Sequence, residues 1–278
     1  MISRRGFLLG GLGLATAGIG GTGVVAATSR GRRILHAVGL LDRDDSPAPG
    51  GGPPVEDRRF DSESMQGRVR YAVASPASDA PLVYALHGRG ADHTFAVSSV
   101  RLQDFLAAAG VVATVVSVDG GPSSYWHPRR TGVDALGMLV RELVPLVEST
   151  FGNGRRAIVG WSMGGYGALL AASRFPSLFP VVVATAPALW RKAEESAPGA
   201  FDGELDFRAH DVFTATDRLT GVTVRLDCGR DDPFVDAVQA LGKRLPEAEV
   251  HVARGFHDAA TWRRMAPGQA AFLGRALA

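Results

Sequence analysis

The chain of 278 residues contains a single cysteine, Cys228, which excludes an intramolecular disulfide and any cysteine-rich metal cage. It also has little net charge, because 30 Lys and Arg residues face 28 Asp and Glu residues for a total of +2. No dense basic run with interleaved aromatics occurs, so the sequence predicts no nucleic-acid partner. Hydrophobic residues make up 46% of the chain, which is enough for one large core.

The N-terminus has the features of an export segment. Ser3-Arg4-Arg5-Gly6-Phe7-Leu8-Leu9 resembles a twin-arginine signal, and an uncharged, glycine-rich run over residues 6–29 follows the two arginines. Small residues at Val25-Ala26-Ala27 suit a signal peptidase. The run is also long enough to cross a bilayer, so a retained anchor with membrane association stays open beside cleaved export. Residues 1–28 are therefore predicted to direct the protein out of the cytoplasm.

The next segment, residues 29–60, is basic at first and then rich in Pro and Gly. It lacks the apolar content of a core, so the sequence predicts a flexible linker. Its early arginines could contact anionic lipid, although a solvated tail is the favoured interpretation. The folded domain is predicted over residues 61–278.

Within that domain, buried or alternating apolar runs alternate with helical patterns. Strands are predicted near residues 68–73, 82–86, 111–118, 157–160, 181–185, 222–226 and 248–253. Helices are predicted near residues 96–109, 133–150 with a kink or break at Pro145, 234–245 and 259–277, and in the alanine- and leucine-rich segment after Ser162. This alternation predicts an α/β fold whose mostly parallel sheet has helices on both faces and its chemistry beyond the carboxyl ends of the strands. Residues 187–220 give no clear pattern and are expected to form a cap or loops.

One stretch organises the functional prediction: Ala157-Ile158-Val159-Gly160-Trp161-Ser162-Met163-Gly164-Gly165-Tyr166-Gly167. A strand, a tight turn with a central serine and a helix form the G-x-S-x-G nucleophile elbow. The turn is so sharp that side chains at its flanks would collide with their neighbours, which explains the glycines. The elbow exposes the Ser162 hydroxyl beside a helix N-terminus, which favours developing negative charge.

A serine nucleophile needs a base and an orienting carboxylate, and on this fold the chain order is Ser, acid, His. Of the histidines after Ser162, His251 alternates within a strand and His210 precedes the acid candidates. His257 follows the last strand and is the predicted base. His127 is the runner-up, although it precedes the serine.

The acid is expected after the penultimate strand, in Asp227-Cys228-Gly229-Arg230-Asp231-Asp232-Pro233. The glycine three positions before Asp232 and the proline after it favour Asp232 over Asp231. Either aspartate could instead cap the following helix.

Two backbone N–H groups are needed to stabilise the oxyanion. The predicted donors are Met163, directly after the nucleophile, and Arg89 in the glycine-rich loop after residues 82–86, with Gly90 as second choice for the latter. His87 is expected to hold that loop by packing and hydrogen bonds. Tyr125 and Trp126 lie beyond a strand end and are predicted to form a wall of the substrate pocket, with ordinary loop packing as the alternative.

The segments LHGRG, DGG with YWH, GWSMGGYGA, GRDDP and GFHDAATW together resemble the α/β-hydrolase superfamily over residues 82–262. More narrowly, they resemble the "putative esterase" family that includes esterase D, feruloyl esterases and the mycolyltransferases of mycobacteria. The resemblance implies a triad carried by Ser162, Asp232 and His257. The acid of mycolyltransferases is a glutamate, so the aspartate departs from that narrower group.

The leading hypothesis is an exported serine esterase that hydrolyses a small-molecule or lipid ester through an acyl-enzyme, with no metal and no cofactor. An acyltransferase that passes the same acyl group to an alcohol is the first alternative. A non-catalytic envelope-binding protein on a hydrolase scaffold is the second.

Overall fold

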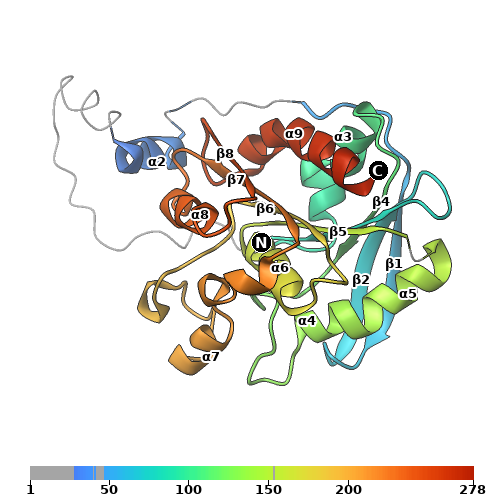
Figure 1. Ribbon diagram of the computed structural model, residues 1–278, viewed down its shortest axis with the longest axis horizontal. Coiled ribbons are helices and arrows are strands. Elements are labelled where there is room, and N and C mark those ends of the chain that lie inside the picture. The colour runs from blue at the N-terminus through green and yellow to red at the C-terminus, as the bar shows by residue number, and fades with distance from the viewer. Residues whose placement is uncertain (1–27, 40, 42–46, 153) are drawn as a thin grey trace, which may run out of the picture. The chain divides into compact units, whose positions relative to one another are not determined.

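The computed structural model describes residues 28–39, 41, 47–152 and 154–278 (Figure 1). The chain divides into two compact units, Met1–Arg43 and Asp44–Ala278. In the first unit, helix α2 (Ser29–Ala37) is capped by Thr28, whose hydroxyl accepts a hydrogen bond from the Gly31 N–H at 3.0 Å. Apart from Thr28, the predicted export segment lies outside the described residues. Among the helices that are described, none is both long and apolar enough to span a membrane.

The linker predicted over residues 29–60 contains regular structure that the sequence pattern did not indicate. Besides α2, strand β1 (Val55–Ser62) lies in this segment and pairs antiparallel with β2 (Gly67–Ala74) along its full length. The folded sheet therefore begins at Val55, and the boundary predicted at residue 61 is wrong. The reason is that β1 is an edge strand with mostly exposed, charged side chains, including Asp57 in an ion pair with Arg70.

The second unit is built on one eight-stranded sheet with the order β1-β2-β4-β3-β5-β6-β7-β8. The first two strands are antiparallel to their neighbours, and every later pairing is parallel. Every residue of β3, β4 and β6 is buried, as expected for strands covered on both faces. The remaining strands are β3 (Leu82–Leu86), β4 (Thr114–Val118), β5 (Arg156–Trp161), β6 (Val181–Thr185), β7 (Thr223–Gly229) and β8 (Glu249–Ala253).

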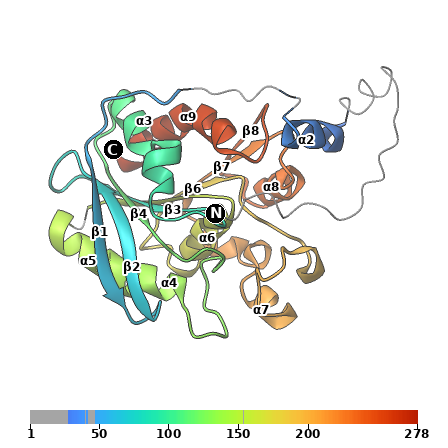
Figure 2. The ribbon, with the colours of Figure 1, turned by 180° about the vertical axis from the view of Figure 1, so that it is seen from behind.

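Helices cover both faces of this sheet. Figures 1 and 2 show α3 (Leu102–Ala108) and α9 (Ala259–Leu277) side by side on one face, with α5 (Val144–Phe151) and α6 (Met163–Arg174) on the other. Helix α8 (Val235–Gly242) connects β7 to β8. The fold is that of an α/β hydrolase, which confirms the predicted class. Because β3, β5, β7 and β8 are parallel, the loops after them lie at one edge of the sheet.

Two predicted helices depart from a regular α-helix, each for a local reason. The segment over residues 96–109 divides at Arg101, whose φ of 63° ends the π-helical turn η1 (Phe95–Val100) before α3 begins. The segment over residues 133–150 stays helical from α4 (Ala135–Gly137) through the π-helical η2 (Met138–Leu143) into α5. Pro145 lacks an N–H and its ring crowds the carbonyl four residues earlier, and the wider π turn before it accommodates both effects.

The segment between β6 and β7 contains short helices and turns, which explains why its sequence had no clear period. These are η3 (Ala193–Glu195), α7 (Glu204–Ala209), η4 (Val212–Thr214) and η5 (Thr216–Leu219). We call residues 187–220 the β6–β7 insertion.

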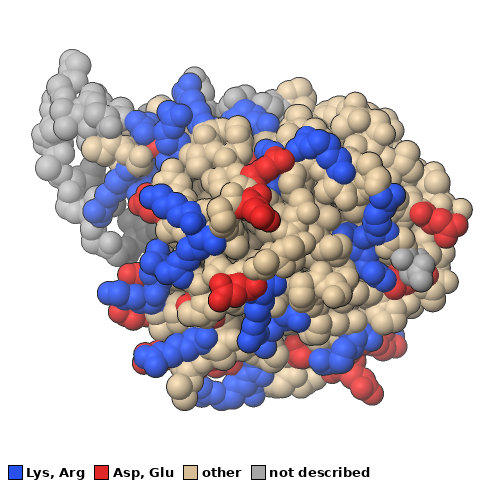
Figure 3. Space-filling model, viewed as in Figure 1, with Lys and Arg blue, Asp and Glu red and all other residues tan. Residues whose placement is uncertain are grey.

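On the face of the molecule seen in Figure 3, basic and acidic side chains are interspersed. The absence of a nucleic-acid partner stays a prediction from the sequence.

Candidate active site

The turn between β5 and α6 holds Ser162 in an unusual backbone conformation. Its φ is 55° and its ψ is −115°, a region that side-chain-bearing residues rarely adopt. The strain is maintained by hydrogen bonds on both sides, because the Ser162 N–H donates to Thr185 O at 2.9 Å and its carbonyl accepts from Tyr166 N–H and Ala188 N–H, each at 3.0 Å. The serine side chain is thereby fixed at the tip of the turn, as the elbow motif predicts.

The two glycines of the motif lie at points of backbone contact. A Cβ at Gly160 would lie 2.1 Å from the carbonyl oxygen of Gly164. A Cβ at Gly164 would lie 1.9 Å from the carbonyl oxygen of Leu86, in the neighbouring strand β3. Neither contact is possible for a larger residue, so these positions admit only glycine without movement of the backbone.

Three side chains from separate loops meet in one hydrogen-bonded chain. The Ser162 Oγ lies 2.8 Å from His257 Nε2, and His257 Nδ1 lies 2.6 Å from Asp232 Oδ2. Because Nδ1 donates to the carboxylate, Nε2 carries the lone pair and accepts the hydroxyl proton. The structure therefore brings together the three residues that the sequence analysis predicted as nucleophile, acid and base.

The structure also separates the two adjacent aspartates. The Asp232 side chain is fully buried, and its second oxygen accepts from the Phe234 N–H at 2.9 Å, which fixes the carboxylate plane. The backbone N–H of Asp231 donates to Gly255 O at 2.9 Å. Of the two, the carboxylate that reaches the imidazole is that of Asp232.

Aromatic rings on both sides orient the imidazole of His257. The ring of Phe234 lies 5.4 Å from it and that of Trp262 lies 5.2 Å from it, both edge to face. The side chain of His257 remains 26% exposed, so a substrate and water can reach it. The hydrogen bond to Asp232 and these two rings leave the imidazole little freedom to rotate away from the serine.

The single cysteine, Cys228, lies next to Asp232 and does not compete with Ser162 as a nucleophile. Burial raises the pKa of the Cys228 thiol, and the neighbouring Asp232 carboxylate raises that pKa further. The thiol is therefore neutral and poorly nucleophilic at neutral pH.

The loop after β3 lies directly against the nucleophile, since a Cβ at Gly88 would be 3.5 Å from the Ser162 Cβ. The Gly90 N–H donates to Pro122 O at 2.8 Å, so it is already engaged. In the described part of the chain, the backbone N–H groups of Arg89 and Met163 have no backbone acceptor. This geometry favours Arg89 over Gly90 as partner of Met163.

His87 fixes the loop after β3 through hydrogen bonds to backbone atoms. It is fully buried, and its Nε2 accepts from the Gly120 N–H at 3.0 Å, so its Nδ1 carries the proton that is donated to Gly88 O at 2.8 Å. The Trp126 indole N–H donates to the His87 carbonyl at 3.3 Å. The histidine therefore has the packing and hydrogen-bonding part that the sequence indicated.

Tyr125 and Trp126 do not form the exposed pocket wall that we predicted. Their exposed fractions are 3% and 0%, so neither presents a surface to a substrate. The Trp126 ring fills the space beside two glycines, where a Cβ at Gly120 or at Gly167 would approach it to 2.5 Å. An aromatic pair beyond a strand end can pack inward as readily as outward, and here the two glycines provide room for the inward orientation.

Among the described residues, the Ser162 hydroxyl is hydrogen-bonded to His257 and to none of the other histidines considered as bases. His127 is buried, with its ring nitrogens near the carbonyl oxygens of Pro128 and Ala200 and its ring stacked on Phe201. His210 follows α7, and His251 is exposed on β8.

A cavity of about 560 Å³, which no sequence pattern predicted, lies beside the site. Phe234 lines this cavity and also contacts the imidazole of His257. The Trp190 ring, which lines the cavity too, packs edge to face on Phe234 at a centroid distance of 5.5 Å. The only sequence signal was the position of Phe234, two residues after the acid. The cavity is lined by apolar residues and three charged ones: Leu189, Trp190, Arg191, Glu195, Ala197, Pro233, Phe234, Asp236 and Ala237.

Comparisons with known proteins agree with the fold and give the family. The family model described as "Putative esterase" matches residues 62–269. A curated esterase from Mycobacterium tuberculosis strain H37Rv is 27% identical over 185 residues, which cover 59% of this chain and 38% of that protein. The chain therefore spans well under half the length of this relative.

Solved structures share the architecture at low sequence identity. A ferulic acid esterase superposes with a TM-score of 0.70 and 21% identity, covering 81% of this chain and 99% of the other. An S-formylglutathione hydrolase from Agrobacterium tumefaciens superposes with a TM-score of 0.67 and 19% identity, covering 82% and 96%. At these identities the superpositions establish a common fold.

We predict that Gly164→Ala lowers the free energy of unfolding by about 3 kcal/mol or more, the upper end of the cost of overpacking, because the new methyl meets a backbone carbonyl. Urea denaturation measures this directly. Gly67→Ala is the matched control, since nothing lies within 4 Å of its Cβ position, and it should leave stability unchanged or slightly higher. Equal stability of Gly164→Ala and wild type would contradict the contact.

Proposed function

The chain belongs to the "Putative esterase" family, and on that premise we propose that it is an exported serine esterase that hydrolyses carboxylic esters through an acyl-enzyme on Ser162. The observation that carries this proposal is the unbroken chain from Ser162 Oγ through His257 to Asp232, with hydrogen bonds of 2.8 and 2.6 Å. A serine without such a base is a poor nucleophile at neutral pH.

The proposed reaction uses each of these groups in turn. As Ser162 Oγ attacks the ester carbonyl carbon, His257 Nε2 takes the hydroxyl proton and Asp232 stabilises the imidazolium. The tetrahedral oxyanion accepts hydrogen bonds from the N–H groups of Met163 and Arg89, which are free of backbone acceptors and lie beside the nucleophile. The intermediate collapses when His257 returns the proton to the departing alcohol, leaving the acyl group on Ser162.

Deacylation repeats the same steps with water as the nucleophile. His257 removes a proton from water, which attacks the acyl carbonyl, and then returns the proton to Ser162 Oγ. The 26% exposure of the His257 side chain supports access of that water. No step requires a metal or a cofactor.

The cavity beside Phe234 is the proposed binding site for one half of the ester. Its walls from Leu189, Trp190 and Ala197 suit an apolar group, and Arg191 and Glu195 offer polar contacts. The volume of about 560 Å³ accommodates a small molecule. We therefore propose a small-molecule ester substrate, and a series of p-nitrophenyl esters of graded acyl length would define the acyl group.

Export is proposed from the N-terminal sequence alone, since Arg4 and Arg5 precede an uncharged run of export-signal type. A twin-arginine route carries folded proteins, which suits a domain whose only cysteine is buried and free. Membrane association would follow if the segment is retained.

We predict that Asp232→Asn lowers kcat by about 10⁴-fold, because the amide no longer holds the reactive tautomer of His257 or stabilises its cation. Asp231→Asn is the matched control and should keep most of the turnover. Steady-state kinetics on a p-nitrophenyl ester measures both, and circular dichroism verifies folding. The opposite order of the two losses would assign the acid to Asp231.

Export is tested with a reporter protein fused behind residues 1–40. We predict that the fusion leaves the cytoplasm and that Arg4→Lys combined with Arg5→Lys retains it inside, because the twin-arginine pathway reads the arginine pair. Cell fractionation measures the distribution. Equal export of both fusions would contradict the twin-arginine assignment.

A further inference from the structure

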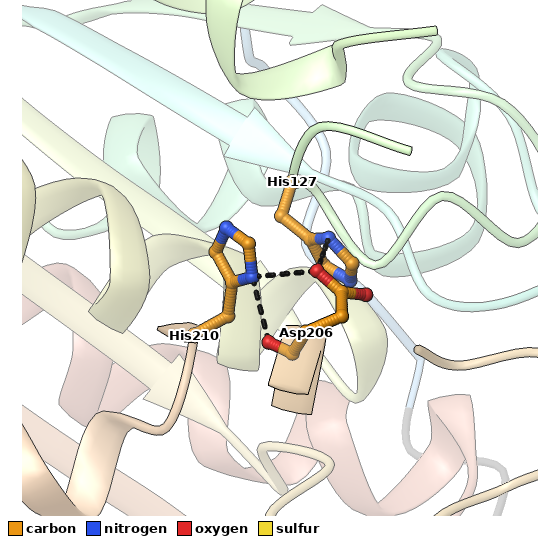
Figure 4. Close-up of side chains that lie close together, drawn as sticks. All are labelled: His127, Asp206 and His210. Atoms are coloured by element: carbon orange, nitrogen blue, oxygen red, sulfur yellow. Dashed lines mark hydrogen bonds and ion pairs between the residues drawn. The ribbon is translucent and has the colours of Figure 1, made fainter. Parts of the chain in front are cut away.

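A second cluster of chemically capable side chains lies outside the proposed triad. His127 comes from the loop after β4, and Asp206 and His210 come from α7 and the residue that ends it (Figure 4). One donor atom from each residue lies within 4.8 Å of the other two. The hydrolysis described above uses none of these three residues.

The local structure directs all three donors to one point. Asp206 and His210 are four residues apart, so they lie on one face of the α7 turn. The Asp206 Oδ1 is 2.9 Å from His210 Nδ1 and 3.8 Å from His127 Nδ1 (Figure 4). The other carboxylate oxygen accepts from the Asp202 N–H at 2.7 Å, which turns Oδ1 toward the histidines.

The two imidazoles lie against each other beside the carboxylate. Their rings stack with centroids 4.5 Å apart and planes at 24°. The His210 Nδ1 lies 2.9 Å from both the carbonyl oxygen and the Oδ1 atom of Asp206, so it donates a hydrogen bond there. Two imidazoles and one carboxylate are a set of ligands for a cation, which would replace the proton on His210 Nδ1.

His127 has a mismatch that a bound cation would resolve. The residue has no exposed surface, and its Nε2 lies 3.1 Å from Ala200 O while its Nδ1 lies 3.0 Å from Pro128 O. A neutral imidazole has one N–H, so it can donate to only one of these carbonyls. If Nε2–H donates to Ala200 O, the Nδ1 lone pair faces the Pro128 oxygen. A cation at Nδ1 changes this repulsive contact into coordination.

We propose that His127, Asp206 and His210 bind one divalent transition-metal ion of the zinc type. Two imidazoles and a carboxylate are ligands that Zn²⁺ prefers, whereas Mg²⁺ and Ca²⁺ prefer oxygen-rich sites. A cavity of about 520 Å³ is lined by Pro128, Asp206 and His210, together with the charged residues Arg129, Arg130, Asp202 and Glu204, and gives an ion access to two of the three ligands. A water entering through it would be the fourth ligand. The metal site shares no residue with the triad.

The ion joins two segments that are distant in sequence. Arg129 pairs with Asp202 at 2.9 Å, and the Tyr166 hydroxyl donates to His210 O at 2.8 Å, so polar contacts already connect the β6–β7 insertion to the rest of the domain. That insertion also carries Trp190 of the cavity beside the triad. The metal therefore stabilises the insertion and, through it, one wall of the proposed substrate cavity.

The test uses the full chain without a polyhistidine tag, stripped of metal by a chelator and titrated with ZnCl₂ in a calorimeter. We expect saturation at one Zn²⁺ per chain and a rise of the unfolding temperature with zinc concentration. Co²⁺ in place of Zn²⁺ should give the visible absorption of a tetrahedral site. Mg²⁺ and Ca²⁺ at the same concentrations should bind far more weakly.

Asp206→Asn and His210→Gln each remove one ligand of the ion. Each should weaken Zn²⁺ binding by about 100-fold or more, because loss of a residue that only supports a ligand already costs about 10–100-fold in metal affinity. Glu204→Gln is the matched control, because this residue lines the same cavity on the same helix without belonging to the cluster, and it should bind as wild type does. Ser162→Ala should also bind as wild type, which separates this proposal from the proposed esterase activity.

Two results would overturn the proposal. One is the absence of saturable Zn²⁺ binding by the wild-type chain. The other is wild-type affinity in both Asp206→Asn and His210→Gln, which would leave the cluster as an ordinary hydrogen-bonded group. If either variant fails to fold by circular dichroism, the Co²⁺ spectrum of the wild-type chain decides, since a spectrum without tetrahedral bands contradicts the ligand set.

Discussion

The close approach of the α6 N-terminus to strand β3 is the constraint on which the site depends. With Gly164 against the Leu86 carbonyl, the chain must turn within one residue, and Ser162 takes a φ of 55° as a result. The strain is maintained because strands β3 and β6 on either side of β5 are completely buried. The serine is thus positioned by the core of the sheet, and the loops that carry Asp232 and His257 need only reach a fixed point.

Much of this arrangement could be predicted from sequence because the informative residues follow buried strands. Residues 82–86 and 181–185 form strands with the predicted bounds. Residues 259–277 form a helix with the predicted bounds. Chain order left three histidines after Ser162, and their places relative to the strands favoured His257 as the base, while two aspartates stayed candidates for the acid. The choice between those two depends on the direction of each side chain in a tight turn, which periodicity does not encode.

The features that the sequence did not reveal are those without a regular pattern of side chains along the chain. Strand β1 is charged and at the edge, so it lacks the apolar alternation of a strand. Trp126 is buried because Gly120 and Gly167 leave space for its ring, a contact between distant segments. The cluster of His127, Asp206 and His210 also joins segments far apart in the chain, and its only local sign was the four-residue spacing of Asp206 and His210.

The central claim is that the Ser162 hydroxyl is a nucleophile activated by its neighbours, and its most direct test is covalent labelling by a fluorophosphonate followed by intact-mass analysis. We expect the wild-type chain to gain the mass of one probe molecule and to lose ester hydrolysis in parallel. Ser162→Ala, folded by circular dichroism, should gain no mass. Equal labelling of both chains, or a wild-type chain that remains unlabelled, would contradict the account.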